Sequence, residues 1–225
     1  LVLGGALTML TGLLFLLGLA SLLSPKEKTS RYWRTGVFLG LALLCRPPVL
    51  MMSAGLVLWL VIIHKERRRN IFHLLFGMLA ILLIGVALDS WFYGSFTLTA
   101  WNYARLGVAG STDHSFTSFP WWYYFAWIIK YAIPLFGIPV LLAFGVLLVL
   151  RPKSILVWAI TPFLLLHILL SHKELRFLWP LAELVPLMLI SAAGACLAKW
   201  PLKTEALLQR SIMVPFRIFL VAINV

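Results

Sequence analysis

The chain has 225 residues, of which 62% are hydrophobic and 12% charged, and its formal net charge is +12. A soluble domain of this size could not cover so much apolar surface, so the composition excludes an ordinary water-soluble protein and predicts a membrane protein. The positive charge does not indicate nucleic-acid binding, because the basic residues form short clusters between long apolar runs. Such clusters are typical of the loops that set membrane topology.

The chain starts without a methionine and ends on an apolar run. We therefore expect a fragment of a longer protein, with residues 1–225 forming a single transmembrane domain. The first run, Leu1 to Leu23, is long enough to span a bilayer and lacks a basic leader and a cleavage site, so it predicts a transmembrane helix. Cys45 and Cys196 lie inside apolar runs, where we expect buried thiols.

Between the first two basic loops, residues 24–34 and 65–69, lies one apolar stretch that is broken at Arg46-Pro47-Pro48. Both flanking loops are predicted to be cytoplasmic. Because prolines end helices and push the preceding residue out of the α region, we predict two short helices that meet at this break. Arg46 then either lines a cavity on the outer side or occupies an ordinary interhelical turn.

The remaining apolar runs alternate in direction: residues 71–88 outward, 125–150 inward, 155–170 outward and 177–198 inward, with a last segment near 213–225. Basic residues at 151–153 and 199–203 mark further cytoplasmic loops. The sequence thus predicts an all-α, polytopic transmembrane bundle of about seven to eight membrane segments, including the broken pair. The aromatic run Phe119 to Tyr124 indicates an interfacial belt, with a sugar-binding platform as the alternative.

Five cations fall toward the outer face and are not explained by loop topology: Arg46, Arg105, Lys130, Lys173 and Arg176. A charge in hydrocarbon costs about 2.5–3.5 kcal/mol on insertion scales. Arginine binds phosphate bidentately and lysine binds it as a point charge, so the set favours a lipid-phosphate ligand. For each residue alone, an interfacial anchor or a structural ion pair is the alternative.

Ser171 to Pro180 holds four ionisable side chains in five residues. If this segment starts a helix, His172 and Arg176 share one face as an i, i+4 pair. The histidines show no metal-ligand spacing, and no Gly-rich phosphate loop, serine nucleophile elbow or cysteine nucleophile signature is present. No cofactor site is evident in these residues, and a metal would have to be held by residues outside this stretch or be absent.

The segment His172 to Phe177 matches the H-K-E-x-R-F signature of the Alg9-like α-mannosyltransferases, glycosyltransferase family 22, which has the GT-C fold. Three weaker elements occur in the family's order. Arg46-Pro47-Pro48 resembles its Arg-Pro-Thr break, with Pro48 in place of threonine. Asp89 to Gly94 resembles its Asp-x-x-Phe-[Tyr/Phe]-Gly element, and Trp101 to Tyr103 resembles its aromatic-Asn-aromatic element. The spacing most resembles the GPI mannosyltransferase III branch.

The resemblance implies transfer of mannose, with inversion, from a polyprenyl- or dolichyl-phosphate-mannose donor to a lipid-linked glycan. The reaction would take place on the lumenal face of the endoplasmic reticulum membrane or the periplasmic face of a bacterial inner membrane. It implies that Arg46, Lys173 and Arg176 contact the donor phosphate. It also implies residues that shape the site: His172, Glu174, Asp89 and Asn102.

The family's catalytic base is an acidic residue in an outer loop that would precede residue 1, so we expect this stretch alone to be inactive. Rival hypotheses are a GT-C enzyme with another polyprenyl-phosphate sugar donor, a lipid or solute transporter with broken helices, and a non-catalytic scaffold.

Overall fold

The computed structural model describes residues 2–24, 28–99, 101–102, 105, 119–131, 133–170 and 173–200, without the side chains of 2–5, 28–29 and 133–135. All regular structure in these ranges is helical, which confirms the predicted all-α class. The helices are α1 (Val2–Leu23), α2 (Lys28–Cys45), η1 (Pro47–Val49), α3 (Leu50–Ile62), α4 (Arg68–Tyr93), α6 (Tyr123–Tyr131), α7 (Ile133–Leu150), α8 (Ile155–Leu169), η2 (Leu175–Leu178), α9 (Trp179–Ala182) and α10 (Val185–Lys199).

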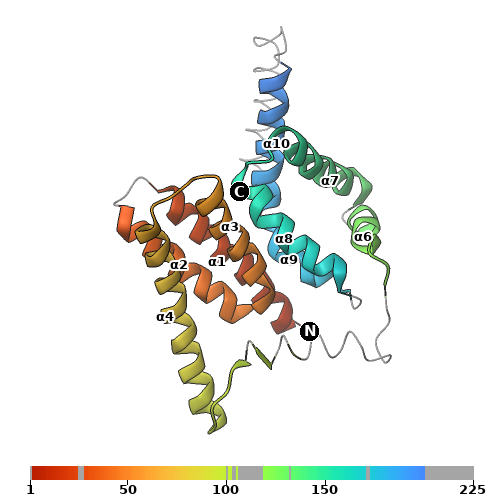
Figure 1. The fold of residues 1–225 in the computed structure, drawn as a ribbon. Coiled ribbons are helices and arrows are strands. Elements are labelled where there is room, and N and C mark those ends of the chain that lie inside the picture. Colours follow the sequence, from red (N-terminus) through yellow and green to blue (C-terminus); the bar gives the residue numbers. More distant parts are fainter. Residues whose placement is uncertain are drawn as a thin grey trace, which may run out of the picture.

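The helices form two groups, α1 to α4 and α6 to α10, which lie side by side (Figure 1). Within the first group, α2 packs against both α1 and α4, and within the second, α7 packs against α6 and α10. The groups are joined where α3 packs on α8 and α1 packs on α9. A single cluster of buried apolar side chains runs through both groups, for example Phe15, Leu56, Ile160 and Met188.

The predicted proline break is confirmed. Helix α2 ends at Cys45, and Arg46 has φ −156° and ψ 104°, the extended conformation that a following proline imposes. Pro47 and Pro48 occupy the first positions of η1, where a missing N–H leaves no hydrogen bond unmade. Helix α3 then begins at Leu50 and returns the chain toward the end from which α2 started.

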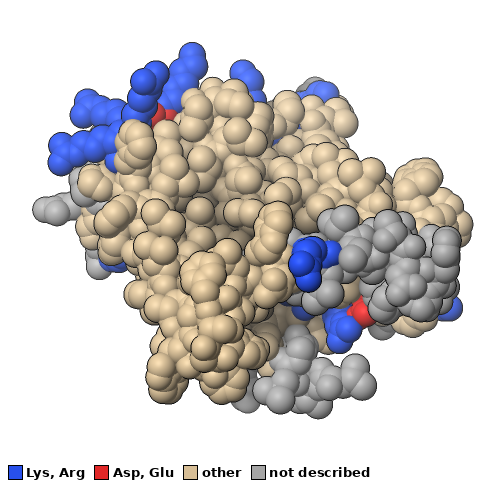
Figure 2. Space-filling model, turned by 60° about the horizontal axis from the view of Figure 1, so that its bottom comes forward, with Lys and Arg blue, Asp and Glu red and all other residues tan. Residues whose placement is uncertain are grey.

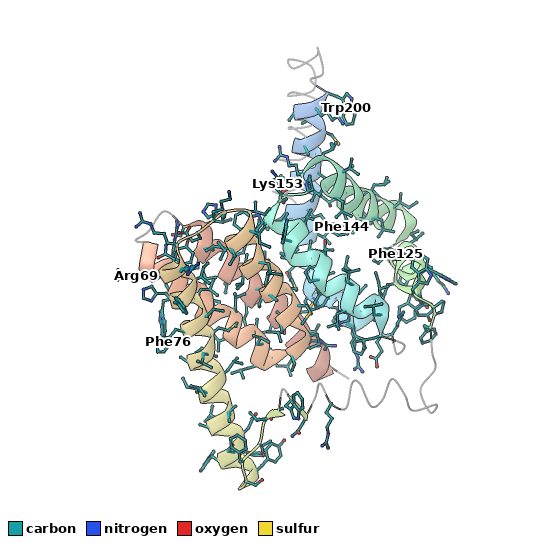
Figure 3. The ribbon with its side chains drawn as sticks, viewed as in Figure 1. Arg69, Phe76, Phe125, Phe144, Lys153 and Trp200 are labelled. Atoms are coloured by element: carbon teal, nitrogen blue, oxygen red, sulfur yellow. The ribbon has the colours of Figure 1, made fainter. Side chains whose placement is uncertain are left out.

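The basic loops gather at one end of the bundle. Arg69 and Lys153 both lie toward the upper end in Figure 3, and Figure 2 shows Lys and Arg side chains crowded along that edge of a mostly uncharged surface. The indole N–H of Trp59 donates to the carbonyl of Lys153 at 2.8 Å, so the turn between α7 and α8 is tied to α3. Arg46 and the segment after α8 lie at the other ends of their helices, as the topology count predicted.

Two helices among the described residues are long and apolar enough to cross a membrane: Ala6–Leu23 within α1, and α4. The number rises to four if two bent pairs each count as one span, α7 with α8 (118°) and η2–α9 with α10 (60°). The structure therefore supports a membrane protein, while the count of seven to eight segments stays a prediction. Cys45 and Cys196 are free thiols.

Two interfaces between helices depend on glycine. A β-carbon on Gly55 of α3 would collide with the carbonyl oxygen of Trp158 in α8, and one on Gly36 of α2 would collide with that of Leu74 in α4. The backbones of these helices are therefore in direct contact. Close packing through small residues is a main source of helix association in membranes, where lipid removes most of the hydrophobic drive between helices.

We expect Gly55→Ala to lower the unfolding free energy by about 1–3 kcal/mol, the usual cost of inserting a methyl group into a packed interior. Thermal unfolding of the detergent-solubilised protein measures the effect. Gly145→Ala in α7 is the matched control, because a β-carbon there meets no atom within 4 Å. Equal unfolding temperatures for the two variants would contradict the close contact of α3 with α8.

Glu66 fixes the loop between α3 and α4 to the start of α2. Its carboxylate accepts hydrogen bonds from the Tyr32 hydroxyl (2.6 Å), the Asn70 amide (2.8 Å) and the backbone N–H of Arg67 (3.0 Å). Burial by itself would raise the pKa of Glu66, but these hydrogen bonds and the nearby His64 outweigh it and lower the pKa to about 2. Tyr32 is 1% exposed, so its hydroxyl has little access to water as an alternative partner.

A lowered pKa in the folded state means that Glu66 stabilises the protein above its ordinary pKa of 4.5 and loses that contribution as the pH falls toward 2. We expect the wild-type unfolding temperature to fall over this window. Glu66→Gln should destabilise the protein at neutral pH by about 1.5–3 kcal/mol and flatten the pH dependence. Parallel acid-side slopes for the variant and the wild type would show that Glu66 is not the responsible group.

Candidate functional site

Arg46 reaches from the helix break into the interface between α1 and the second helix group. Its Nη1 donates to the Thr8 hydroxyl at 2.7 Å, and Thr8 is fully buried in α1. Its guanidinium carbon lies 5.1 Å from the centre of the Phe177 ring, a cation–π distance. The sequence left open whether Arg46 lines an outer cavity or occupies an ordinary interhelical turn. In the structure its side chain contacts Thr8 of α1 and Phe177 of η2, so it lies between helical segments.

Arg176 approaches the same aromatic ring from η2. Its guanidinium forms an ion pair with Glu174 and lies 6.0 Å from the Phe177 ring centre. The side chain of Arg176 is 40% exposed, so this ion pair is partly open to solvent. The structure thus brings together three predicted site residues, Arg46, Glu174 and Arg176, from distant parts of the chain.

Lys173 and Glu174, the first described residues of the charged segment, are not helical. Glu174 is extended, with φ −131° and ψ 140°, and the first helical turn, η2, starts at Leu175. The i, i+4 pairing of His172 with Arg176 therefore lacks its helical basis, and His172 lies outside the described residues. The extended backbone leaves Lys173 free to fold back on α8.

Lys173 is buried, with 2% of its surface exposed. Its ammonium donates to the backbone carbonyls of Leu170, Ile168 (2.9 Å) and His167 (3.4 Å), which end α8 without helical partners of their own. Burial lowers the pKa of the Lys173 ammonium. All three donors of the ammonium are thus used on the α8 terminus, and the predicted contact of Lys173 with a phosphate stays a prediction.

Sequence reasoning missed the roles of two buried residues beside these charges. His167 of α8 is 2% exposed, with Nδ1 2.8 Å from the carbonyl of Phe163, and interacts electrostatically with Arg46 and Lys173. The ring of Tyr124 in α6 lies 5.7 Å from the Lys173 ammonium. His167 could have been found as an isolated polar residue within an apolar run, whereas Tyr124 was assigned to the interfacial belt.

Asp89 and Asn102 are not brought to this cluster. Asp89 lies near the C-terminal end of α4, where it accepts a hydrogen bond from Thr99, and Asn102 is exposed. The end of α4 lies well away from the region of α8 and α9 in Figure 1. Their site-shaping roles stay predictions.

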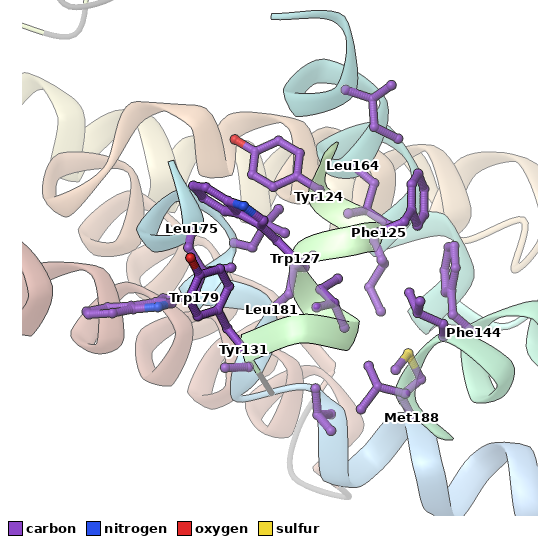
Figure 4. A pocket seen from close by; sticks show the side chains of 18 residues that line it. Tyr124, Phe125, Trp127, Tyr131, Phe144, Leu164, Leu175, Trp179, Leu181 and Met188 are labelled. Atoms are coloured by element: carbon purple, nitrogen blue, oxygen red, sulfur yellow. The ribbon is translucent and has the colours of Figure 1, made fainter. Parts of the chain in front are cut away.

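An apolar cavity of about 280 Å³ lies between α6, α7, α8, α9 and α10 (Figure 4). Its walls include Trp127, Phe144, Leu164 and Met188, and the ring of Tyr124 borders it. Its volume is near the lower end of small-molecule sites, roughly 300–1,000 Å³. Within the described ranges no group of three His, Cys, Asp or Glu side chains could hold a metal ion.

The fold and the site define an all-helical membrane protein in which one buried and two partly exposed cations lie near an apolar cavity. The chain matches the model of the Alg9-like mannosyltransferase family over residues 2–225 and belongs to that family, which confirms the resemblance drawn from the H-K-E-x-R-F signature. This is a family of glycosyltransferases.

The chain is 29% identical to GPI alpha-1,2-mannosyltransferase 3 of Danio rerio, over 69% of this chain and 29% of the relative. It is 26% identical to GPI mannosyltransferase 3 of Candida albicans, over 69% and 31%, and 27% identical to GPI mannosyltransferase 3 of Drosophila melanogaster, over 67% and 28%. The matched region is thus less than a third of each relative. No solved structure matches the chain.

We expect Lys173→Met, which keeps the apolar stem and removes the ammonium, to lower the unfolding free energy by about 1–3 kcal/mol or more. The reason is that buried carbonyls at the end of α8 would lose their donor. Thermal unfolding in detergent measures this, with Lys153→Met at an exposed position as the control. A variant with wild-type stability and a raised donor KM would instead assign Lys173 to the donor phosphate alone.

Proposed function

We propose that the chain is part of a mannosyltransferase that uses a polyprenyl- or dolichyl-phosphate-mannose donor. The acceptor is a hydroxyl of a lipid-linked glycan, and transfer inverts the β-linked donor to an α-mannoside. The relatives' names specify GPI mannosyltransferases, and that of the Danio rerio protein specifies an α-1,2 linkage. We extend both the GPI acceptor and the endoplasmic reticulum membrane to this chain as part of the proposal.

The observation that carries the proposal is the meeting of Arg46 and Arg176 at the ring of Phe177. Both cations lie at the end of the bundle opposite the basic loops, beside an apolar cavity. A lipid-phosphate sugar fits this arrangement, because cations would bind its phosphate and an apolar wall would bind its polyisoprenoid chain. Guanidinium groups placed at the phosphate stabilise the charge that develops as it departs.

We propose a role for each of these residues from its contacts. Arg176 and Arg46 bind the donor phosphate, and Glu174 orients Arg176 through its ion pair. Lys173 holds the end of α8, and with it the backbone that leads into the signature. An inverting transfer also needs a carboxylate to accept the proton of the acceptor hydroxyl. Because the Glu174 carboxylate is paired with Arg176, we propose that the catalytic base is none of the residues named here.

In the full-length enzyme we expect Arg176→Ala to reduce mannose transfer by about 10²–10³-fold, as the loss of one group that stabilises transition-state charge does. Membrane insertion should be unchanged. Transfer from dolichyl-phosphate-mannose in proteoliposomes is the measurement, and Arg151→Ala at the exposed opposite end is the control. Wild-type turnover by Arg176→Ala would remove the phosphate-binding role.

Competition between purified polyprenyl-phosphate sugars in the same assay separates mannose from other donors. Membership of a mannosyltransferase family argues against the transporter hypothesis.

A further inference from the structure

Tyr124 lies where the apolar cavity meets the charged cluster. Its ring borders the cavity, together with Trp127 and Tyr131 of the same helix, α6. In Figure 4 its hydroxyl points away from the other labelled side chains of the cavity. The residue is 2% exposed, so neither its ring nor its hydroxyl has much contact with the surroundings of the bundle.

The hydroxyl of Tyr124 is buried, and its O–H has no hydrogen-bond acceptor in the part of the chain that the structure describes. Such a group is uncommon in proteins, because a buried polar atom without a partner costs free energy. The backbone N–H of Glu174 faces the hydroxyl oxygen, the charges of Glu174 and Arg46 lie nearby, and the Lys173 ammonium lies 5.7 Å from the ring centre. Among the described residues, the buried hydroxyls of Ser53 and Thr161 also lack a partner, but neither borders the cavity.

The chemistry of the neighbours indicates what the hydroxyl could bind. The ammonium of Lys173 is directed at three carbonyls, and Glu174 is paired with Arg176. A neutral phenol is an O–H donor at physiological pH. It therefore offers a hydrogen bond to an anion beside Arg46, without adding a further charge to a buried site.

We propose that Tyr124 is a donor-binding residue, whose hydroxyl donates a hydrogen bond to a phosphate oxygen of a polyprenyl-phosphate ligand. Its ring would at the same time border the first apolar units of the lipid. Tyr124 would thus set the position at which the apolar chain ends and the phosphate begins. This inference rests on the proposed function, since it names a contact of the same donor.

The test is Tyr124→Phe in the full-length protein, which keeps the ring and the cavity wall and removes only the hydroxyl. Tyr123→Phe is the matched control, because Tyr123 lies on the same helix but does not border the cavity. Two quantities are measured for each: the Kd for dolichyl phosphate without a sugar, and the KM for dolichyl-phosphate-mannose in the transfer assay.

We expect Tyr124→Phe to weaken dolichyl-phosphate binding and raise the donor KM by about tenfold, as the loss of a hydrogen bond to a charged group does. The acceptor KM should not change, and the Tyr123→Phe control should match the wild type. The unfolding temperature of Tyr124→Phe should change little, since the O–H has no acceptor among the described residues.

Wild-type Kd and donor KM in Tyr124→Phe would overturn the inference. A large fall in the unfolding temperature would also overturn it, because it would reveal an acceptor within the protein for the Tyr124 O–H. A wild-type protein that binds dolichyl phosphate but transfers no mannose would refute the proposed function while leaving the Tyr124 contact measurable. The two failures are therefore distinguishable.

Discussion

The two prolines that follow Arg46 force the chain out of helical geometry inside an otherwise apolar stretch, and the organisation of the bundle depends on that break. With a continuous helix, residues 35–63 would place their two basic flanks at opposite ends. The break lets α2 and α3 run in opposite directions, so both flanks lie at one end and Arg46 lies at the other. The bond from Arg46 to Thr8 then holds the exposed backbone of the break against α1.

The two ends of the bundle use positive charge in different ways. At one end, basic side chains are exposed, as expected for residues whose role is to set orientation in a membrane. At the other end, Lys173 is buried against backbone carbonyls and Arg46 lies between a hydroxyl and an aromatic ring. Charges with such specific partners are expensive to bury and hold the elements around them in fixed positions.

Much of the fold could be predicted from the sequence. The break at Arg46, the helical runs and the common end of the basic loops all follow from proline chemistry, apolar run length and charge counts, because each is a local signal. The helical spacing considered for His172 and Arg176 does not apply, because Glu174 is extended and the Lys173 ammonium contacts the carbonyls of α8. Residue spacing alone does not predict that a lysine side chain will donate hydrogen bonds to the C-terminal carbonyls of the preceding helix. The place of Tyr124 was missed for a similar reason, because an aromatic cluster looks the same in sequence whether a ring faces lipid or protein.

The glycine contact between α3 and α8 has a consequence for the chemistry as well as for stability. Helix α3 starts directly after the Arg46 break, and α8 ends at the carbonyls held by Lys173. The contact between these helices at Gly55 therefore helps to fix the positions of Arg46 and Lys173 relative to each other. A substitution at Gly55 would shift these two residues without replacing a charged side chain.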